Sequence, residues 1–213
     1  MERSPIEAVL FDNDGTLVDS EAISNEVMVA TLGRHGIELG LEEAVTRWSG
    51  VDLHLMLRIL QEESGVTLPG DFLDEFRAGQ LAELEARVEA MPGAAEVLRR
   101  LELPRAVVSN APVTKIALCL RTAELMEFID ERHLYSAYDV GKWKPDPASY
   151  LHAARSMGVA PERCAVVEDS VSGVEAGRAA GMRTFAFDHR GELPDWPDVE
   201  RLEALTDLLD RLD

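Results

Sequence analysis

The sequence predicts an α/β fold in which helices cover a parallel sheet and a separate helical segment is inserted near the start of the chain. Short apolar runs of β-type composition alternate with segments of helical periodicity, which is the pattern of a parallel sheet buried on both faces. Residues 18–90 interrupt this alternation because their pattern is helical throughout. The 213 residues, 46% of them hydrophobic, suffice for one buried domain and a smaller module. The predicted fold is therefore a Rossmann-like parallel sheet core with an inserted α-helical cap.

Five runs are expected to form the strands of the sheet. They are EAVLF, RAVVS, the weaker HLYSAY, CAVVE and RTFAF, at residues 7–11, 105–109, 133–138, 164–168 and 183–187. Helical segments separate them. The segment KPDPASYLHAARSMG predicts one such helix, with Asp146 at its N-cap, Pro147 in its first turn and Gly158 just past its end.

The helical insertion has readable limits. Glycines and the Pro69–Gly70 pair separate its helices, and the α/β pattern resumes at the motif MPGAAE, where Pro92 opens a helix. We therefore expect residues 1–17 and 91–213 to form a discontinuous α/β core, and residues 18–90 to form the cap.

The composition limits the kinds of partner. Forty acidic residues against 21 basic ones give a formal charge of −19, which opposes binding to nucleic acid or to an anionic membrane. The N-terminal residues lack the apolar core of a signal peptide, and no apolar run approaches the ~20 residues of a membrane span. We expect a cytoplasmic protein. Cys119 and Cys164 have no metal-type spacing and are expected to be reduced packing residues.

Polar side chains follow three of the predicted strands. They are Asp12 and Asp14 after the first strand, Ser109 and Asn110 after the second, and Glu168 and Asp169 after the fourth. In an open α/β sheet, ligands bind beyond the carboxyl ends of the strands. Carboxylates that lie within ~4–6 Å of one another resist joint ionisation unless a cation sits among them. Hard oxygen ligands of this kind suit Mg²⁺, and Lys144 can add a fixed positive charge.

Each of these features has a simpler explanation. An Asp-x-Asp-Gly sequence often forms only a turn, and the motifs SNAP and EDS can be helix caps. A single lysine is usually solvated. The functional interpretation is favoured because every one of these features falls where a strand ends.

The same motifs resemble a known family. In order and spacing, FDNDGTLVDSE, VVSNAP, KPDP and VVEDSVSGVEAGRAAGM are similar to the four motifs of the haloacid dehalogenase superfamily, and specifically of its β-phosphoglucomutase-like phosphatases. They span residues 11–181. The stretches RWSGVDL and YDVGKWKPDPASYLHAARSMG further resemble bacterial sugar-acid phosphatases such as the 6-phosphogluconate phosphatases.

The resemblance implies a role for each residue of these motifs. Asp12 would be the nucleophile that forms an aspartyl-phosphate, and Asp14 the general acid and base. The phosphate-binding residues would be Ser109, Asn110 and Lys144, and the Mg²⁺ ligands Asp12, the carbonyl of Asp14, Asp169 and, as an open question, Glu168. The expected partner is a small phosphorylated metabolite, bound by a monomer.

Other reactions of the superfamily fit this sequence less well. Dehalogenases lack the second aspartate, so Asp14 argues against them. The β-phosphoglucomutases carry a histidine and an arginine where this chain has Ser24 and Leu53, which favours water as the phosphoryl acceptor. A sugar-phosphate mutase and a non-catalytic phosphometabolite-binding protein remain as alternatives. Receiver domains, which use a similar residue set, are about half as long and have no cap.

The cap is expected to choose the substrate, since the resemblance implies that it closes over the core. Gly50 lies in the motif SGVDL, which is similar to the family's cap loop and allows close approach of the backbone. Arg77 is a candidate for binding a substrate carboxylate or a distal phosphate, with a solvated helix arginine as the alternative.

Overall fold

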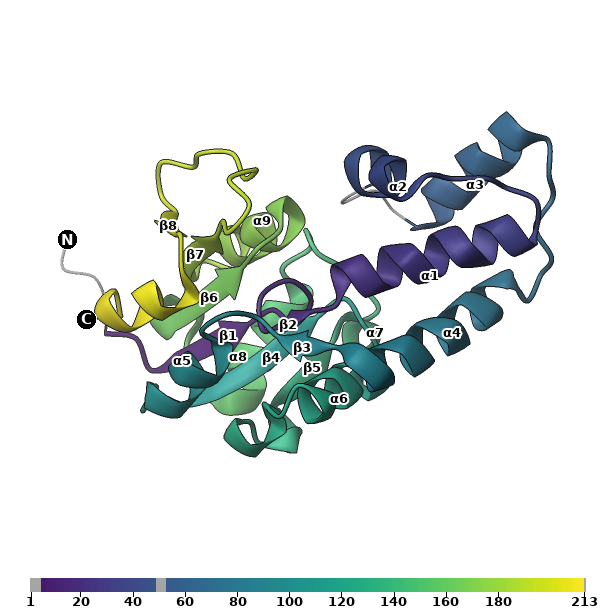
Figure 1. The fold of residues 1–213 in the computed structure, drawn as a ribbon. Helices are drawn as coiled ribbons and strands as arrows, with labels where there is room; N and C mark the ends of the chain where they lie inside the picture. The colour runs from purple at the N-terminus through teal and green to yellow at the C-terminus, as the bar shows by residue number, and fades with distance from the viewer. Residues whose placement is uncertain (1–4, 49–52, 213) are drawn as a thin grey trace. The chain divides into compact units, whose positions relative to one another are not determined.

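The chain divides into two compact units. The computed structural model describes residues 5–48 and 53–212. One unit combines the chain up to Asp19 with the chain from Glu89 onward, and the other spans Ser20–Val88. Figure 1 shows the first as a sheet with helices and the second as helices alone.

The first unit contains a parallel sheet, as predicted. Six strands lie in the order β5-β4-β1-β6-β7-β8, and every neighbouring pair is parallel. Their bounds are β1 Ala8–Phe11, β4 Arg105–Ser109, β5 Leu134–Ser136, β6 Cys164–Glu168, β7 Arg183–Phe187 and β8 Glu200–Leu202. The five predicted runs are thus confirmed, with the weak one shortened to three residues. The edge strand β8 was not predicted, because its sequence ERL is short and mostly polar.

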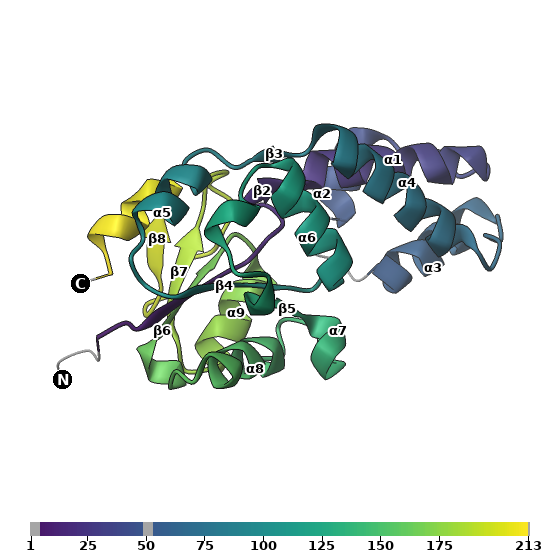
Figure 2. The same cartoon turned by 90° about the horizontal axis from the view of Figure 1, so that it is seen from below.

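Helices cover the sheet on both faces. They are α5 Ala94–Arg100, α6 Val113–Thr122, α7 Ala137–Val140, α8 Ala148–Met157 and α9 Val171–Ala179, with short 3-10 helices at Met126–Phe128, Glu131–His133, Pro161–Arg163 and Leu205–Asp210. Figure 2 shows α5 and α6 on one side of the sheet and α8 on the other. Alternate strand residues such as Leu10, Val108 and Val166 pack with Tyr150 of α8 in one buried cluster. This two-sided burial explains the continuous apolar strand runs.

The start of α8 differs slightly from the prediction. Pro147, not Asp146, is the residue that precedes the first helical residue. Asp146 nevertheless performs the capping interaction, since its Oδ1 accepts a hydrogen bond of 2.9 Å from the backbone N–H of Ala148. Gly158 ends the helix at φ 72°, in the left-handed region that glycine adopts without strain.

Two short strands mark where the chain leaves and re-enters the first unit. Strand β2 (Val18–Asp19) pairs antiparallel with β3 (Glu89–Ala90). Both strands belong to the first unit, which therefore ends at Asp19 and resumes at Glu89. The helical unit is thus two residues shorter at each end than the expected cap of residues 18–90. Strands of two residues are too short to show a period in the sequence.

The second unit is helical over its described residues. It comprises α1 Glu21–Arg34, α2 Leu41–Trp48, α3 Leu53–Ser64 and α4 Phe72–Arg87. Helices α1 and α4 run side by side (Figure 1), and Leu32, Leu57 and Phe76 belong to one buried cluster. None of the helices in the described ranges combines the length and apolar composition that a membrane span needs.

Candidate active site

The three strands that carry the predicted site residues are neighbours in the sheet. Strand β1 lies between β4 and β6, with Phe11 beside both Val107 and Val167. The backbone N–H of Asp12 continues this ladder with a 2.9 Å hydrogen bond to the carbonyl of Val167. Asp12, Ser109 and Glu168 therefore lie at the carboxyl ends of three adjacent strands in the centre of the sheet.

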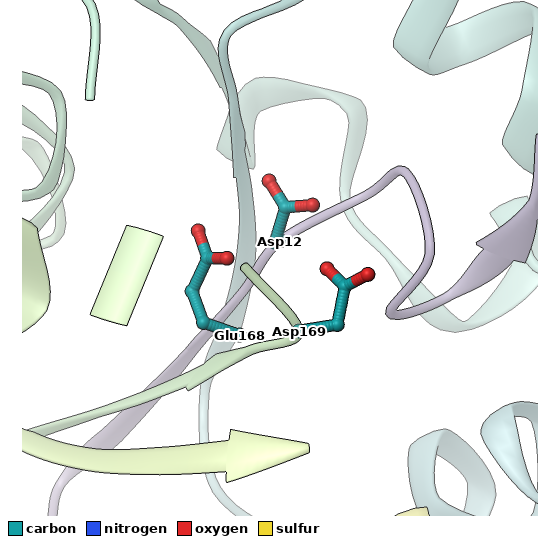
Figure 3. Close-up of side chains that lie close together, drawn as sticks. All are labelled: Asp12, Glu168 and Asp169. Carbon is teal, nitrogen blue, oxygen red and sulfur yellow. The ribbon is translucent and has the colours of Figure 1, made fainter. Parts of the chain in front are cut away.

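Three carboxylates meet there. Asp12, Glu168 and Asp169 each offer an oxygen atom, and these atoms lie within 4.8 Å of one another. Figure 3 shows Asp12 coming from the end of β1 and the other two from the end of β6, with the carboxyl groups gathered in one region. The prediction that these side chains converge is thus met by the geometry.

Lys144 is buried inside this acidic group. Its ammonium donates hydrogen bonds to Asp12 Oδ1 at 2.6 Å, to Glu168 Oε1 at 2.6 Å and to the carbonyl of Val108 at 2.7 Å. Burial by itself would lower the pKa of Lys144, but the charges of Asp12 and Glu168 raise it above its ordinary value. The lysine is a permanent cation next to Asp12.

Glu168 is held at both of its oxygens. Oε1 accepts from Tyr150 as well as Lys144, at 2.8 Å from the phenol, and Oε2 accepts from the Ser170 hydroxyl at 3.0 Å. No part of the Glu168 side chain is exposed. A buried carboxylate with three donors is strongly stabilised. In this conformation both oxygens of Glu168 accept hydrogen bonds, and Oε1 anchors Lys144.

The excess of negative charge makes the site suited to a cation. Desolvation raises the pKa of Asp12, and although Lys144 opposes this, Glu168 and Asp14 raise it further, so the pKa lies above its ordinary value. One ammonium does not neutralise three clustered carboxylates. A divalent cation among Asp12, Glu168 and Asp169 would relieve this repulsion, and an all-oxygen ligand set is the type that Mg²⁺ prefers.

The residues after Asp12 form a tight turn. The N–H of Gly15 bonds to the carbonyl of Val18 at 2.8 Å, and Gly15 has φ +83°. A Cβ atom at this position would lie 2.0 Å from Asp169 Oδ2. Thr16 donates from its hydroxyl to Asp169 Oδ1 at 3.1 Å. Glycine is therefore required here both for the backbone conformation and for the approach of Asp169.

Asp14 does not belong to the group of three clustered carboxylates. Its Oδ1 accepts a hydrogen bond of 2.8 Å from Lys115, on α6, and its Oδ2 is 3.4 Å from the hydroxyl of Ser109. The Ser109 hydroxyl also accepts from the N–H of Ala111 at 3.0 Å. The two aspartates of the first motif thus have different surroundings.

The remaining predicted residues are less directly placed. Asn110 uses its side-chain oxygen to accept from the backbone N–H of Lys144 at 2.9 Å, so it fixes the lysine segment. Arg77 is exposed on α4. Gly50 lies outside the described residues.

Sequence reasoning missed three side chains of the site. Tyr150 contacts Glu168, Thr16 contacts Asp169, and Lys115 contacts Asp14. One signal was available for Lys115: only three of the chain's 21 basic residues are lysines, at positions 115, 142 and 144. Tyr150 gave no such signal, because it fits the apolar face of its helix.

A glycine in α9 provides a test of how tightly the site is packed. A Cβ atom on Gly173 would lie 1.8 Å from Cδ of Glu168. We expect Gly173→Ala to lower the free energy of unfolding by about 1–3 kcal/mol, the range for overpacking a core, as measured by urea denaturation. The matched control is Gly33→Ala in α1, where a Cβ would meet nothing within 4 Å and alanine should stabilise by about 0.5–1 kcal/mol. Equal effects of the two substitutions would show that Glu168 does not need the glycine.

Comparison with known proteins agrees with this geometry. Residues 6–181 match the haloacid dehalogenase-like hydrolase family. The chain is 40% identical over 185 residues to the 6-phosphogluconate phosphatase of Escherichia coli K12, covering 86% of this chain and 83% of that protein. It is 30% identical over 201 residues to hexitol phosphatase A of the same organism, covering 90% and 87%.

A solved structure gives the same result. A haloacid dehalogenase family hydrolase from Deinococcus radiodurans R1, determined with bound phosphate and sodium, superposes with a TM-score of 0.78 at 36% identity, covering 98% of this chain and 95% of that one. The resemblance seen in the sequence motifs and the expectation of an enzyme are confirmed. By its strand-end carboxylates, its buried lysine and these relatives, the chain belongs to the haloacid dehalogenase-like hydrolases.

Proposed function

We propose that the protein is a Mg²⁺-dependent phosphatase that hydrolyses a small sugar phosphate or sugar-acid phosphate through an aspartyl-phosphate on Asp12. The observation that carries this proposal is the convergence of Asp12, Glu168 and Asp169 within 4.8 Å, with the Lys144 ammonium 2.6 Å from Asp12. It supplies a nucleophile, a cation site and a fixed positive charge in one place.

The reaction would proceed in two steps on the chain's own carboxylates. In the first, an oxygen of Asp12 attacks phosphorus while Asp14, in its protonated form, gives its proton to the departing sugar oxygen. In the second, Asp14 takes a proton from water and the water oxygen attacks the phosphorus of the aspartyl-phosphate. The bond between phosphorus and the Asp12 oxygen breaks, which restores the Asp12 carboxylate and frees inorganic phosphate. Lys144 stays charged throughout and offsets the negative charge of the phosphoryl oxygens.

The cation would be held by the carboxylates of Asp12 and Asp169, with the carbonyl of Asp14 as the resemblance implies. Bound Mg²⁺ neutralises negative charge on the transferring phosphoryl group and so lowers the cost of bringing it to a carboxylate. Ser109 and Asn110, at the end of β4, lie next to Asp14 and the backbone of Lys144 and are the proposed phosphate contacts.

The structure of the second unit supports hydrolysis over phosphoryl transfer between sugar hydroxyls. Ser24, where the mutases carry histidine, accepts a 2.9 Å hydrogen bond from Gln80 and donates one of 2.8 Å to the carbonyl of Ser20. Leu53, where they carry arginine, packs against the hydrophobic cluster of its own unit. Both positions serve internal packing. Gly50 and Arg77 remain predicted substrate contacts.

The test is ³¹P NMR of the purified protein with 6-phosphogluconate, and separately with β-glucose 1-phosphate and a bisphosphate primer. With Mg²⁺ we expect inorganic phosphate from the first substrate and little glucose 6-phosphate from the second, and chelation by EDTA should stop turnover. Glucose 6-phosphate accumulating faster than inorganic phosphate would establish the mutase instead. The protein is also tested for phosphate release from a panel of some tens of phosphorylated metabolites. Binding of 6-phosphogluconate with no release of phosphate from it or from any member of the panel would indicate a non-catalytic binding protein.

A further inference from the structure

Helix α6 brings a lysine to the turn that follows Asp12. Lys115 is the third residue of α6, which begins directly after the SNAP motif. Helical side chains lean toward the N-terminal end of their helix. The position of Lys115 in the first turn therefore directs its ammonium back to the strand ends, where it lies 2.8 Å from Oδ1 of Asp14.

This ion pair is largely removed from solvent. The side chain of Lys115 is 14% exposed and that of Asp14 is 22% exposed. An ammonium with so little hydration is costly unless an anion compensates it. One turn further along α6, Cys119 is fully buried, and burial together with the charge of Asp14 raises the pKa of its thiol to about 12. The thiol is neutral, so the anion that compensates Lys115 is Asp14.

Lys115 holds the Asp14 carboxylate more strongly than the Ser109 hydroxyl does. The Lys115 contact is a charge-assisted hydrogen bond of ordinary length, whereas the Ser109 hydroxyl lies 3.4 Å from Oδ2, beyond the usual range for such a pair. Without Lys115, the carboxylate would lose this charged partner, and its attraction toward a cation held by Asp12 would be less opposed.

We propose that Lys115 is a positioning residue that keeps the Asp14 carboxylate beside Ser109 and out of the group formed by Asp12, Glu168 and Asp169. The two aspartates of one motif, separated by a single residue, thereby serve different purposes: Asp12 stays with the metal and phosphorus, and Asp14 stays available for the proton. This inference rests on the proposed function, because it requires Asp14 to be the group that moves the proton.

The experiment compares Lys115→Met, which keeps an unbranched stem one atom shorter and removes the charge, with Lys115→Arg and with Arg121→Met. Arg121 lies on the same helix, exposed, in an ion pair with Glu131, and serves as the control. For an alkyl phosphate we expect Lys115→Met to lower kcat by about 10- to 100-fold, the loss that misplacement of a reacting group causes, with KM nearly unchanged. Lys115→Arg should recover most of this loss, and Arg121→Met should resemble the unmodified protein.

Two further measurements separate positioning from other roles. The loss caused by Lys115→Met should be smaller for p-nitrophenyl phosphate, whose leaving group needs no proton, and it should largely vanish when added to Asp14→Asn. An increase in KM alone would instead make Lys115 a substrate-binding residue. Equal losses for both substrates, or a full additional loss in the Asp14→Asn background, would overturn the inference while leaving the proposed function in place. If Asp14→Asn itself showed no dependence on the leaving group, both the proton role of Asp14 and this inference would fall.

Discussion

Asp12→Asn is expected to abolish phosphate release, with a loss greater than about 10⁴-fold, as removal of a covalent nucleophile causes. An amide is neither a competent nucleophile nor an anionic metal ligand. The measurement is steady-state release of inorganic phosphate from 6-phosphogluconate in the presence of Mg²⁺.

Folding of this variant is not expected to suffer. The charged form of Asp12 is disfavoured by burial and by Glu168, so a neutral amide of the same shape removes repulsion while Lys144 keeps its contact with Glu168. Thermal unfolding without metal should therefore occur at the same or a higher temperature than in the unmodified protein. Asp195→Asn, at a side chain that is 98% exposed, is the control and should retain full activity. Substantial turnover by folded Asp12→Asn protein would rule out the aspartyl-phosphate.

Asp14→Asn is expected to lower kcat by about 10²- to 10⁴-fold for alkyl phosphates, the usual contribution of general acid and base catalysis. The loss should be smaller in the first step when the leaving group is p-nitrophenolate, which departs without a proton. Single-turnover measurements with both substrates resolve that step from hydrolysis of the intermediate. Because the proposed metal contact of Asp14 is its backbone carbonyl, Mg²⁺ affinity measured by calorimetry should change little. The same loss for both leaving groups would contradict the general-acid role.

The sequence predicts the centre of the fold well and its margins poorly. Strands β1 and β6 are continuous apolar runs, so burial on both faces could be recognised without knowledge of their partners. Strand β8 consists of Glu200, Arg201 and Leu202, and it is defined by its parallel pairing with β7. Strands β2 and β3 are likewise defined by their pairing with each other. Such elements depend on tertiary context that no local pattern contains.

The same distinction applies to the site. Asp12 and Glu168 could be predicted to meet because each stands where a strand ends, and the carboxyl ends of parallel strands lie on the same side of the sheet. Lys115 and Tyr150 lie on helices, where contact with the site depends on the rotation of the helix about its axis. Tyr150 fits an ordinary apolar face, and Lys115 resembles a solvated lysine. Their contacts therefore became visible only in three dimensions.

The pairing of β2 with β3 has an evolutionary consequence. Val18 and Ala90 are paired, so the chain leaves the first unit and returns to it at the same place, although 71 residues separate these two positions. The entropic cost of closing a loop grows only slowly with its length, by about 0.6 kcal/mol for each doubling. Lengthening, shortening or replacing the excursion between these strands therefore leaves the register of the six-stranded sheet unaffected. Selection can alter the inserted helices while the arrangement of Asp12, Lys144 and Glu168 is inherited unchanged.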